Sequence, residues 1–503
     1  MCDHESLTCL PSTYAAASGH RTITTNQLLA AATGKRTASV DDHATLAPLV
    51  YPVPLVLPGD DIDCDPNYPP QSFREWLNLG VRNLVSSRRN VIYLAAPPDI
   101  DDSVAFMRDW QHPTAWREAT TSVLEGQLNI EIIAAYLRAF YYGLEVQILP
   151  QRLTFTSWED TTTSTAALRG RGRGAVQATP RLQYVGLSTD SEVVRIRARP
   201  TPPVGSASPP ELFPYPYQLD LNDLTDFSMS ILPSDAYALL LMTTHDLYES
   251  DADDFCCGRA WGASRVAIVS SARYHAALDK LHDIDIEHVW PASHCAAFVR
   301  KMSAEIQTGV RPRNRRRIRG RQKKQDTLTA DSSGSATPMP LQKALDAHRH
   351  AVVHQEGMSR DKETSALSFR LCRTVSHELG HCFGLDHCMY RACVMQGSAS
   401  VAEDVRQPPY LCPVCDRKIA WAITQSGRVE QEGHLTDGSR SRNGRGKGER
   451  GAEEMIAAWK RGRCLAMKHF GNLQGGSFAA MAAWYEGMLE VNAAGLHEYV
   501  SCT

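Results

Sequence analysis

The chain has 503 residues and a formal net charge of -3, which favours a large globular protein without bulk attraction to nucleic acid or anionic membranes. Hydrophobic residues make up 43% and charged residues 22%, ordinary values for a globular chain. No apolar run approaches the roughly 18 residues of a membrane span, and the N-terminus lacks a basic segment followed by an apolar one. We therefore expect a cytoplasmic or nuclear protein that is not secreted and has no membrane partner.

The first part of the chain divides into two regions. Residues 1–50 are polar and rich in Ala and Thr, and we expect a flexible N-terminal region there. Residues 51–305 alternate apolar runs with turn residues, which predicts the N-terminal part of a folded domain. Within it, residues 114–146 carry apolar side chains at helical spacing. Strands are predicted at 90–98, 146–150, 236–244 and 264–271.

The second part is interrupted twice by low-complexity sequence. Residues 306–345 form a basic and polar stretch, and residues 428–452 a second biased stretch; we expect both to be insertions, the first of them disordered. Residues 346–427 lie between them and contain a predicted helix over 363–384. Two helices are predicted within 453–503. The alternation of helices and strands predicts an α/β (α+β) fold with helices on a mixed sheet.

The predicted helix contains the sequence His377-Glu378-Leu379-Gly380-His381, which fits the pattern HExxH. Helix positions i and i+4 lie on one face, so both imidazoles can reach a single zinc ion. Glu378 lies beside that face and can accept a proton from a water molecule as a general base. The pattern therefore predicts metal-assisted hydrolysis.

The sequence after this helix completes a longer pattern. Gly384 and His387 extend the motif to HExxHxxGxxH. Glycine adopts positive φ without penalty, so the helix can end at Gly384 and the chain can reverse to bring His387 to the metal. Three protein ligands leave one coordination position open, which is typical of catalytic rather than structural zinc.

Four cysteines follow within 28 residues. One pair has the spacing C-x4-C and the other the spacing C-x2-C, and together they can fill a tetrahedral thiolate site. A redox-active pair or unrelated buried thiols are the alternatives. In a reducing compartment we favour structural zinc on these residues: Cys388, Cys393, Cys412 and Cys415.

The extended histidine motif followed by Met395 is typical of metzincins. Combined with Cys388-x4-Cys393 and Cys412-x2-Cys415, it resembles the archaemetzincin family of zinc metallopeptidases in its eukaryotic form. Segments such as LPGDDIDCDPNYPPQSFREWL extend the resemblance over roughly residues 52–425.

The resemblance implies a metzincin-like mixed twisted sheet, an active-site helix carrying HExxH and a four-cysteine zinc loop. It implies two zinc ions per chain, with Met395 beneath the catalytic one, and a peptide or protein substrate cleaved in an aminopeptidase-like manner. Metzincins pair extended substrates with a strand ahead of this helix, and we expect 264–274 to be that strand. Arg265 and Arg273 could meet a substrate carboxylate, but we favour solvated surface charges for both.

Two other functions compete with the peptidase. The first is a zinc-stabilised interaction protein without activity, although a purely structural site needs no general base such as Glu378. The second is a nucleic-acid binder using the basic run Arg311–Lys324, which lacks aromatic residues for base stacking. We favour a solvated linker for that run, with a nuclear localisation signal as the next reading, so we do not expect a nucleic-acid partner.

Overall fold

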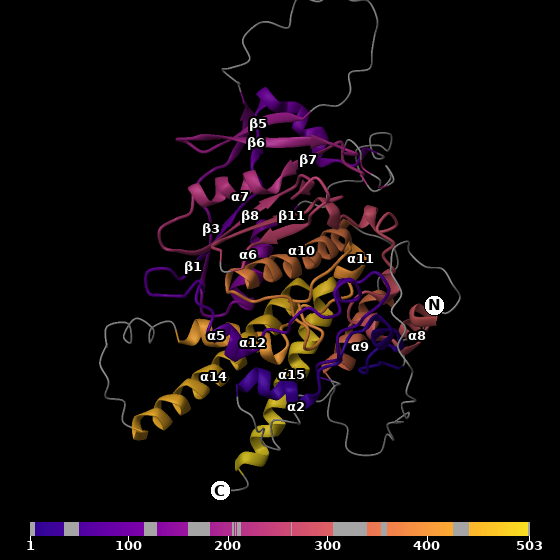
Figure 1. The fold of residues 1–503 in the computed structure, drawn as a ribbon, viewed down its shortest axis with the longest axis vertical. Coiled ribbons are helices and arrows are strands. Elements are labelled where there is room, and N and C mark those ends of the chain that lie inside the picture. Colours follow the sequence, from indigo (N-terminus) through magenta and orange to yellow (C-terminus); the bar gives the residue numbers. More distant parts are fainter. Residues whose placement is uncertain are drawn as a thin grey trace, which may run out of the picture.

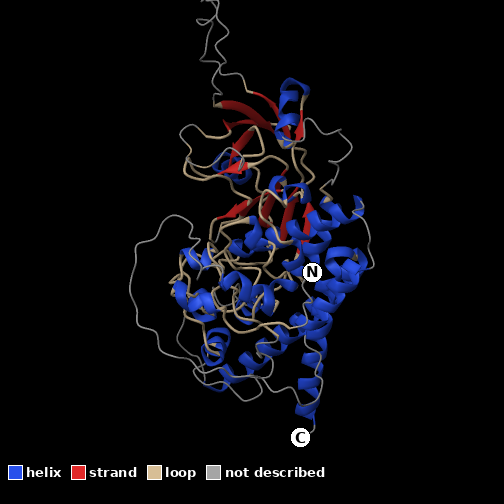
Figure 2. Cartoon of the chain, turned by 90° about the vertical axis from the view of Figure 1, so that its right-hand side faces the viewer, coloured by secondary structure: helices blue, strands red, loops and turns tan. Residues whose placement is uncertain are grey.

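The computed structural model describes residues 6–34, 50–114, 128–158, 182–203, 206, 208, 213–262, 264–304, 340–353, 360–425 and 442–500. Figure 1 shows two β-sheets in its upper half and most of the helices below them. Figure 2 shows the same division from the side, with the strands in red above and the helices in blue below. The expected mixed α/β fold is confirmed.

The sheet nearer the helices has five strands in the order β10-β11-β8-β1-β3. Neighbouring strands from β11 to β3 are parallel, and β10 is antiparallel to β11. The sequence predicted all of these strands except β10, which is too short to show a pattern. Their bounds are β1 (Val91–Ala95), β3 (Glu145–Ile148), β8 (Ala236–Thr243), β10 (Gly258–Ala260) and β11 (Val266–Ser270).

Helices cover both faces of this sheet, which explains why β1, β8 and β11 are buried along their whole length. On β8, Leu240 and Met242 belong to one buried cluster, whereas Leu239 and Leu241 belong to another. Alternate residues of a strand point to opposite faces, so a strand buried on both sides needs a continuous apolar run. Helices α6 (Ile130–Phe140) and α10 (Arg360–Cys382) lie below the sheet in Figure 1, and α7 (Leu221–Ser230) lies above it.

A second sheet of six strands lies beyond α7 and was not predicted. A buried polar network ties it to the first sheet: Arg273 donates to Asp246 through Nε at 2.9 Å and Nη2 at 2.6 Å, and Gln218 donates to the same carboxylate at 2.9 Å. The strands are β2 (Asp99–Ile100), β4 (Thr154–Ser157), β5 (Gln183–Ser188), β6 (Val193–Pro200), β7 (Tyr217–Asp220) and β9 (Leu247–Tyr248).

Part of the N-terminal region is folded, contrary to the flexible region expected over residues 1–50. Helices α1 (Thr13–Ser18) and α2 (Thr25–Thr33) begin with side-chain caps and end in left-handed glycines. Leu28 and Leu29 of α2 are buried in the main core, where α2 packs against α12 (Pro413–Thr424). Short helices of this kind depend on tertiary packing, which local sequence does not reveal.

The C-terminal helices also extend further than predicted. Residues 340–345, expected to close the first insertion, begin α9 (Pro340–Val353), and residues 442–452, expected to be low-complexity insertion, belong to α14 (Arg442–Gln474). Helix α15 (Ala479–Val500) packs against both. The remainder of the two insertions, including the basic run 311–324, lies outside the described residues. Of the helices described, none combines the length and the apolarity required to cross a bilayer.

Shorter elements complete the described chain. They are α4 (Asp61–Cys64), α5 (Phe73–Leu77), η1 (Asp102–Gln111), η5 (Ala272–Tyr274), η6 (Ala276–Leu278), η7 (Ile286–His288), η8 (Ala292–His294), α8 (Ala296–Ala304), α11 (Val401–Asp404) and η9 (Gly476–Phe478).

Candidate metal centres

Helix α10 carries the HExxH residues and is held in place by α6. The Tyr141 hydroxyl donates to the Ser376 carbonyl at 2.7 Å, and the Tyr136 hydroxyl lies 3.2 Å from the Ser376 hydroxyl. Both tyrosines are fully buried. These bonds fix the helix one residue before His377, so its side chains start from a rigid backbone.

The two helical histidines are oriented by backbone carbonyl groups. His377 Nδ1 lies 2.7 Å from the Val394 oxygen, and His381 Nδ1 lies 2.7 Å from the Leu385 oxygen. A carbonyl only accepts, so each Nδ1 carries the proton and each Nε2 keeps its lone pair. The two Nε2 atoms lie 3.1 Å apart. Two lone pairs therefore converge on one point, as metal ligation requires.

The third histidine arrives through a chain reversal at Gly384. This glycine has φ +77°, as the sequence led us to expect, and its N–H donates to the His381 carbonyl at 2.8 Å. Trp76 Nε1 donates to the Phe383 carbonyl at 2.8 Å and closes the helix end. One nitrogen from each of His377, His381 and His387 then lies within 4.8 Å of those of the other two.

Electrostatics keep the three imidazoles neutral. Burial lowers the pKa of His377 well below its ordinary value, and burial lowers the pKa of His381 to about 3. Burial likewise lowers the pKa of His387, with the carboxylate of Asp61 acting in the opposite direction. Neutral imidazole is the form that binds a metal ion.

Glu378 lies on α10 next to strand β10. Burial raises the pKa of its carboxyl to about 8, while the Arg259 charge and a backbone hydrogen bond from Ala260 work against that rise. A β-carbon placed at Gly258 would lie 3.2 Å from the Glu378 Cγ. The carboxyl group is thus enclosed between the metal-binding helix and the outermost strand of the five-stranded sheet.

Met395 packs directly beneath the histidine helix. A β-carbon at Gly380, between the two helical histidines, would overlap the Met395 sulfur. Met395 is fully buried. The structure therefore places this methionine against the helix face between His377 and His381, where the sequence pattern predicts it.

The four cysteines form a second, fully buried group. One sulfur from each lies within 4.8 Å of the other three, and Cys388 Sγ and Cys412 Sγ are 3.4 Å apart. Cys393 Sγ accepts hydrogen bonds from the N–H groups of Met395 at 3.5 Å and Cys412 at 3.2 Å. Burial opposes ionisation of Cys388, but bonds from the other three thiols lower its pKa well below the ordinary value.

Both groups fit zinc by the chemistry of their donors. Three neutral imidazoles suit a zinc ion with an open position, and four sulfurs at this spacing suit a tetrahedral ion with Zn–S bonds of about 2.3 Å. The groups are joined by backbone: Cys388 N–H donates to the Met395 carbonyl at 2.7 Å, and Val394, which holds His377, donates to the Tyr410 carbonyl at 2.8 Å.

The expectation that segment 264–274 receives the substrate is wrong, and the two arginine candidates have other partners. Strand β11, in the segment 264–274 expected to receive the substrate, is paired on both sides, by β8 and β10. Arg273 is buried in its ion pair with Asp246, and Arg265 donates to the Ala236 carbonyl. The resemblance to metzincins favoured β11 as the strand ahead of the active-site helix, whereas the outermost strand on this side is the three-residue β10.

The sequence also gave no role to the turn around Asp61 and Tyr68, which lies against the histidine site. The Tyr68 ring centroid is 6.1 Å from that of His387. A sequence separation of more than 300 residues hid this contact, because turn residues report only local backbone shape.

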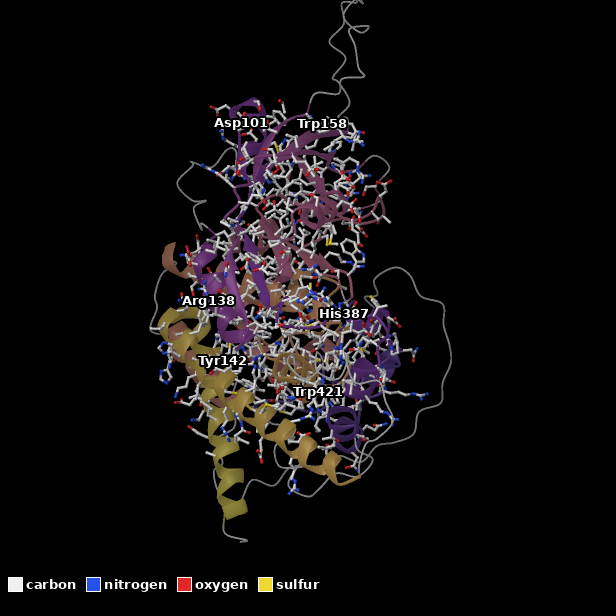
Figure 3. All side chains as sticks on the ribbon, turned by 90° about the vertical axis from the view of Figure 1, so that its left-hand side faces the viewer. Asp101, Arg138, Tyr142, Trp158, His387 and Trp421 are labelled. Carbon is white, nitrogen blue, oxygen red and sulfur yellow. The ribbon has the colours of Figure 1, made fainter. Side chains whose placement is uncertain are left out.

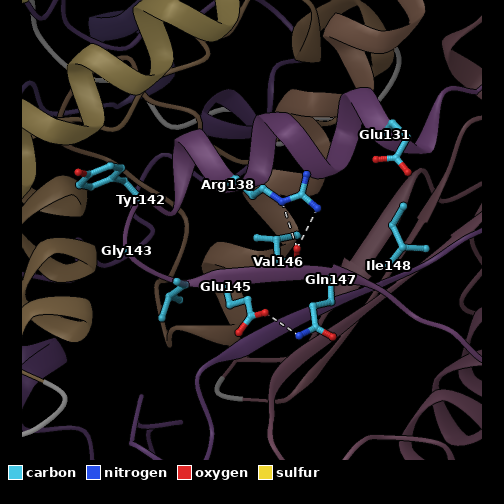
Figure 4. A pocket seen from close by; sticks show the side chains of 9 residues that line it. Glu131, Arg138, Tyr142, Gly143, Glu145, Val146, Gln147 and Ile148 are labelled. Atoms are coloured by element: carbon cyan, nitrogen blue, oxygen red, sulfur yellow. Dashed lines mark hydrogen bonds between the residues drawn. The ribbon is translucent and has the colours of Figure 1, made fainter.

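A surface groove lies elsewhere, between α6 and β3, with a volume of about 720 Å³ (Figure 4). Arg138 crosses it and donates to the Val146 carbonyl, and Glu145 accepts from Gln147 at 2.7 Å. It contains no histidine or cysteine. Figure 3 shows Arg138 and Tyr142 well apart from His387, so this groove is separate from both metal-binding groups.

Comparison with known proteins agrees with this geometry. Residues 348–421 match the sequence profile of peptidase family M54. Mouse archaemetzincin-2 is 27% identical over 206 residues, or 41% of this chain and 42% of the relative. Human archaemetzincin-2 is 28% identical over 207 residues, with the same coverage of both chains. The archaemetzincin of Thermococcus kodakarensis is 44% identical over 67 residues, or 13% of this chain and 36% of the relative.

Among solved structures, the archaemetzincin of Methanopyrus kandleri aligns with a TM-score of 0.28 and 14% identity, over 67% of this chain and 97% of that one. The chain spans less than half the length of the curated archaemetzincin-2 relatives that it matches. The matched residues contain both the three-histidine and the four-cysteine groups. Over these residues the chain is similar to archaemetzincins, which form peptidase family M54.

Proposed function

We propose that this protein is a zinc-dependent peptidase whose catalytic ion is held by His377, His381 and His387. The observation that carries the proposal is the convergence of three neutral imidazoles beside the buried carboxyl group of Glu378. A purely structural metal site does not require an enclosed carboxyl group beside its ligands. The match of residues 348–421 to peptidase family M54 supports the same assignment.

In this proposal Glu378 is the general base. Zinc, when bound, supplies a Lewis acid that polarises the scissile carbonyl and lowers the pKa of water. Glu378 accepts a proton from the attacking water and then delivers it to the leaving amine. Met395 and the carbonyl groups of Val394 and Leu385 hold the imidazoles in position during these transfers.

We place the peptide substrate along β10. This strand is paired on one side only within the described sheet, and it borders Glu378. An extended peptide can add to such an edge through backbone hydrogen bonds. Arg259 of β10 supplies a basic side chain at this edge, half-exposed and paired with Glu249 at 3.3 Å. Preference for the N-terminal residue of a peptide rests on the family resemblance.

We assign a second zinc ion to Cys388, Cys393, Cys412 and Cys415. Four sulfur ligands leave no open position, so this ion is structural in our proposal. It holds the loop that supplies His387 and Met395. A cytoplasmic or nuclear location remains a prediction from the sequence, and reduced thiols there suit such a site.

A peptide-library digest tests the proposal. The purified full-length chain, loaded with zinc, is incubated with mixed peptides beside its Glu378→Gln variant, and products are read by mass spectrometry. We expect cleavage by the first protein only, with metal analysis showing two zinc ions in both. Two zinc ions without any cleavage would favour the alternative, a zinc-stabilised interaction protein.

A further inference from the structure

The three histidines differ in the hydrogen bonds of Nδ1, the ring nitrogen that in His377 and His381 faces away from the other imidazoles. His377 and His381 each donate from Nδ1 to a backbone carbonyl at 2.7 Å. Over the described part of the chain, no carbonyl accepts from His387 Nδ1 in this way. His387 also lies on a loop rather than on α10. The third ligand therefore lacks the support that fixes the ring orientation of the other two.

A carboxylate lies on that side of the His387 ring. A β-carbon built at Gly397 would be 2.7 Å from His387 Nδ1 and 2.7 Å from Asp61 Cγ, and it would overlap Asp61 Oδ2. The two side chains therefore approach each other across the space that Gly397 leaves empty. No donor from the described residues forms a hydrogen bond with the Asp61 carboxylate, so it has capacity to accept one.

The backbone of Asp61 is clamped to the loop that carries Gly397. The Asp61 N–H donates to Glu403 Oε2 at 2.9 Å, and the Ala399 N–H donates to the same oxygen at 2.7 Å. The neighbouring Asp60 forms a buried ion pair with Arg406 at 2.6 Å. Asp61 is thus held at a set distance from the His387 loop, although 326 positions separate the two residues in the sequence.

We propose that Asp61 is the positioning residue of the third zinc ligand: its carboxylate accepts a hydrogen bond from the Nδ1–H group of His387 and so turns Nε2 toward the other two histidines. Metal-bound histidines commonly donate their second ring N–H to a carboxylate, which fixes the tautomer and raises the basicity of the ligand. Asp61 does not belong to the group of donor atoms that converge with the three histidines, so it acts behind the ligand rather than as one. This inference rests on the proposed zinc site.

Gly397 has a matching role. Any larger residue at this position would place its β-carbon between Asp61 and His387, so glycine permits the contact. Its backbone does not adopt positive φ, and the requirement is therefore one of space rather than of backbone conformation.

The test measures metal affinity instead of turnover. Zinc dissociation constants are determined by chelator competition for the full-length protein, Asp61→Ala, Asp61→Asn and the matched control Asp65→Ala. Asp65 lies in the same turn and is exposed. We expect Asp61→Ala to weaken the three-histidine site by about 10- to 100-fold, the range found for such supporting carboxylates. The control should bind as the unchanged protein does.

A spectroscopic readout separates positioning from general loss of structure. With cobalt in the histidine site, the visible absorption bands should change in Asp61→Asn, which keeps the side-chain size but accepts the proton less strongly. Retained zinc at the four cysteines and an unchanged Tm would show that this variant is folded. Equal zinc affinity and identical cobalt spectra in the Asp61 and Asp65 variants would overturn the inference. If the unchanged protein binds no metal at its histidines, both the proposed function and the inference about Asp61 fail.

Discussion

The two halves of the histidine site are built in different ways. His377 and His381 come from one long helix, and bonds from Tyr141 and Tyr136 to Ser376 hold that helix in place. His387 and the four cysteines come from a loop between α10 and α12 with little regular structure. Local helix geometry is sufficient to bring the first pair together. The loop instead needs distant partners and, in our proposal, a metal ion of its own.

The loop half depends on contacts made across the whole sequence. The Ala392 N–H donates to the Pro52 carbonyl at 2.9 Å, and Arg391 donates to the Ile23 carbonyl at 2.9 Å. Burial lowers the pKa of Arg391, and the charge of the nearby Cys412 and Cys388 sulfurs acts in the opposite direction. A long helix can be recognised from its own residues, whereas a loop of this kind is specified by segments that precede it by hundreds of positions.

Removing the cysteine site tests most strongly whether the loop that carries His387 depends on a metal ion of its own. Cys415→Ser should lose one of the two proposed zinc equivalents and should also weaken the histidine site by at least about tenfold, because the loop that carries His387 loses its anchor. Metal analysis after dialysis against a mild chelator measures both effects.

The reverse substitution provides the control for this experiment. His387→Ala should leave the zinc of the four cysteines in place, because α12 and the loop hold those ligands independently. A Cys415→Ser protein that keeps one full zinc equivalent and full activity would show that the loop orders itself without its metal ion.

A substitution of Glu378 tests the half of the site that α10 provides. Glu378→Gln should lower peptide hydrolysis by about 10²- to 10⁴-fold, because the amide keeps the shape of the side chain but cannot accept a proton. Zinc content and Tm should stay near those of the unchanged protein. Glu363→Gln, near the start of the same helix, is the matched control and should keep full activity. Residual activity above about one hundredth of the original rate would remove Glu378 from the role of base.

The N-terminal helix α2 tests whether distant segments support the cysteine site, because it packs against the helix that carries Cys415. Leu28 is fully buried there, so Leu28→Ala should lower the free energy of unfolding by about 2–5 kcal/mol. Leu10 is 63% exposed, and Leu10→Ala should change stability by less than about 0.5 kcal/mol. Urea unfolding measures both. Equal stability of the two variants would mean that α2 is not part of the folded core.

The smallest expected effect lies at the junction of the two halves, Gly384. Its φ of +77° should make Gly384→Ala cost about 1–2 kcal/mol, since a β-carbon is disfavoured in this conformation. The contacts of such a β-carbon would be ordinary, the nearest at 3.5 Å, so the cost is conformational rather than steric. Gly384→Asn should cost less, and Gly262→Ala, which meets nothing within 4 Å, should be nearly neutral. Urea unfolding of the three variants should follow that order.

The sequence predicted the parts of the molecule that depend on local patterns and missed those that depend on distant contacts. Strands β1, β8 and β11 and helix α10 carry their periodicity locally and were predicted, as was the reversal at Gly384. The roles assigned to the histidines, to Glu378 and to the cysteines remain predictions, although the structure brings those residues together. In the second sheet, β2 and β9 have only two residues each, too few to show a pattern, whereas the alternating apolar and basic residues of β6 are a signal that the sequence reading overlooked. The turn at Asp61 could not be placed near His387, because no local pattern encodes a contact over that separation.

Strand β3 forms the edge of the five-stranded sheet opposite β10. At β3, Arg138 donates through Nε and Nη2 to the Val146 carbonyl, an acceptor that another chain could otherwise use. Exposed strand edges invite pairing between molecules and eventual aggregation. A charged guanidinium group over this edge obstructs such pairing. Self-association through β3 is thereby discouraged, and replacing Arg138 with an uncharged residue would make the protein more prone to form insoluble assemblies at high concentration.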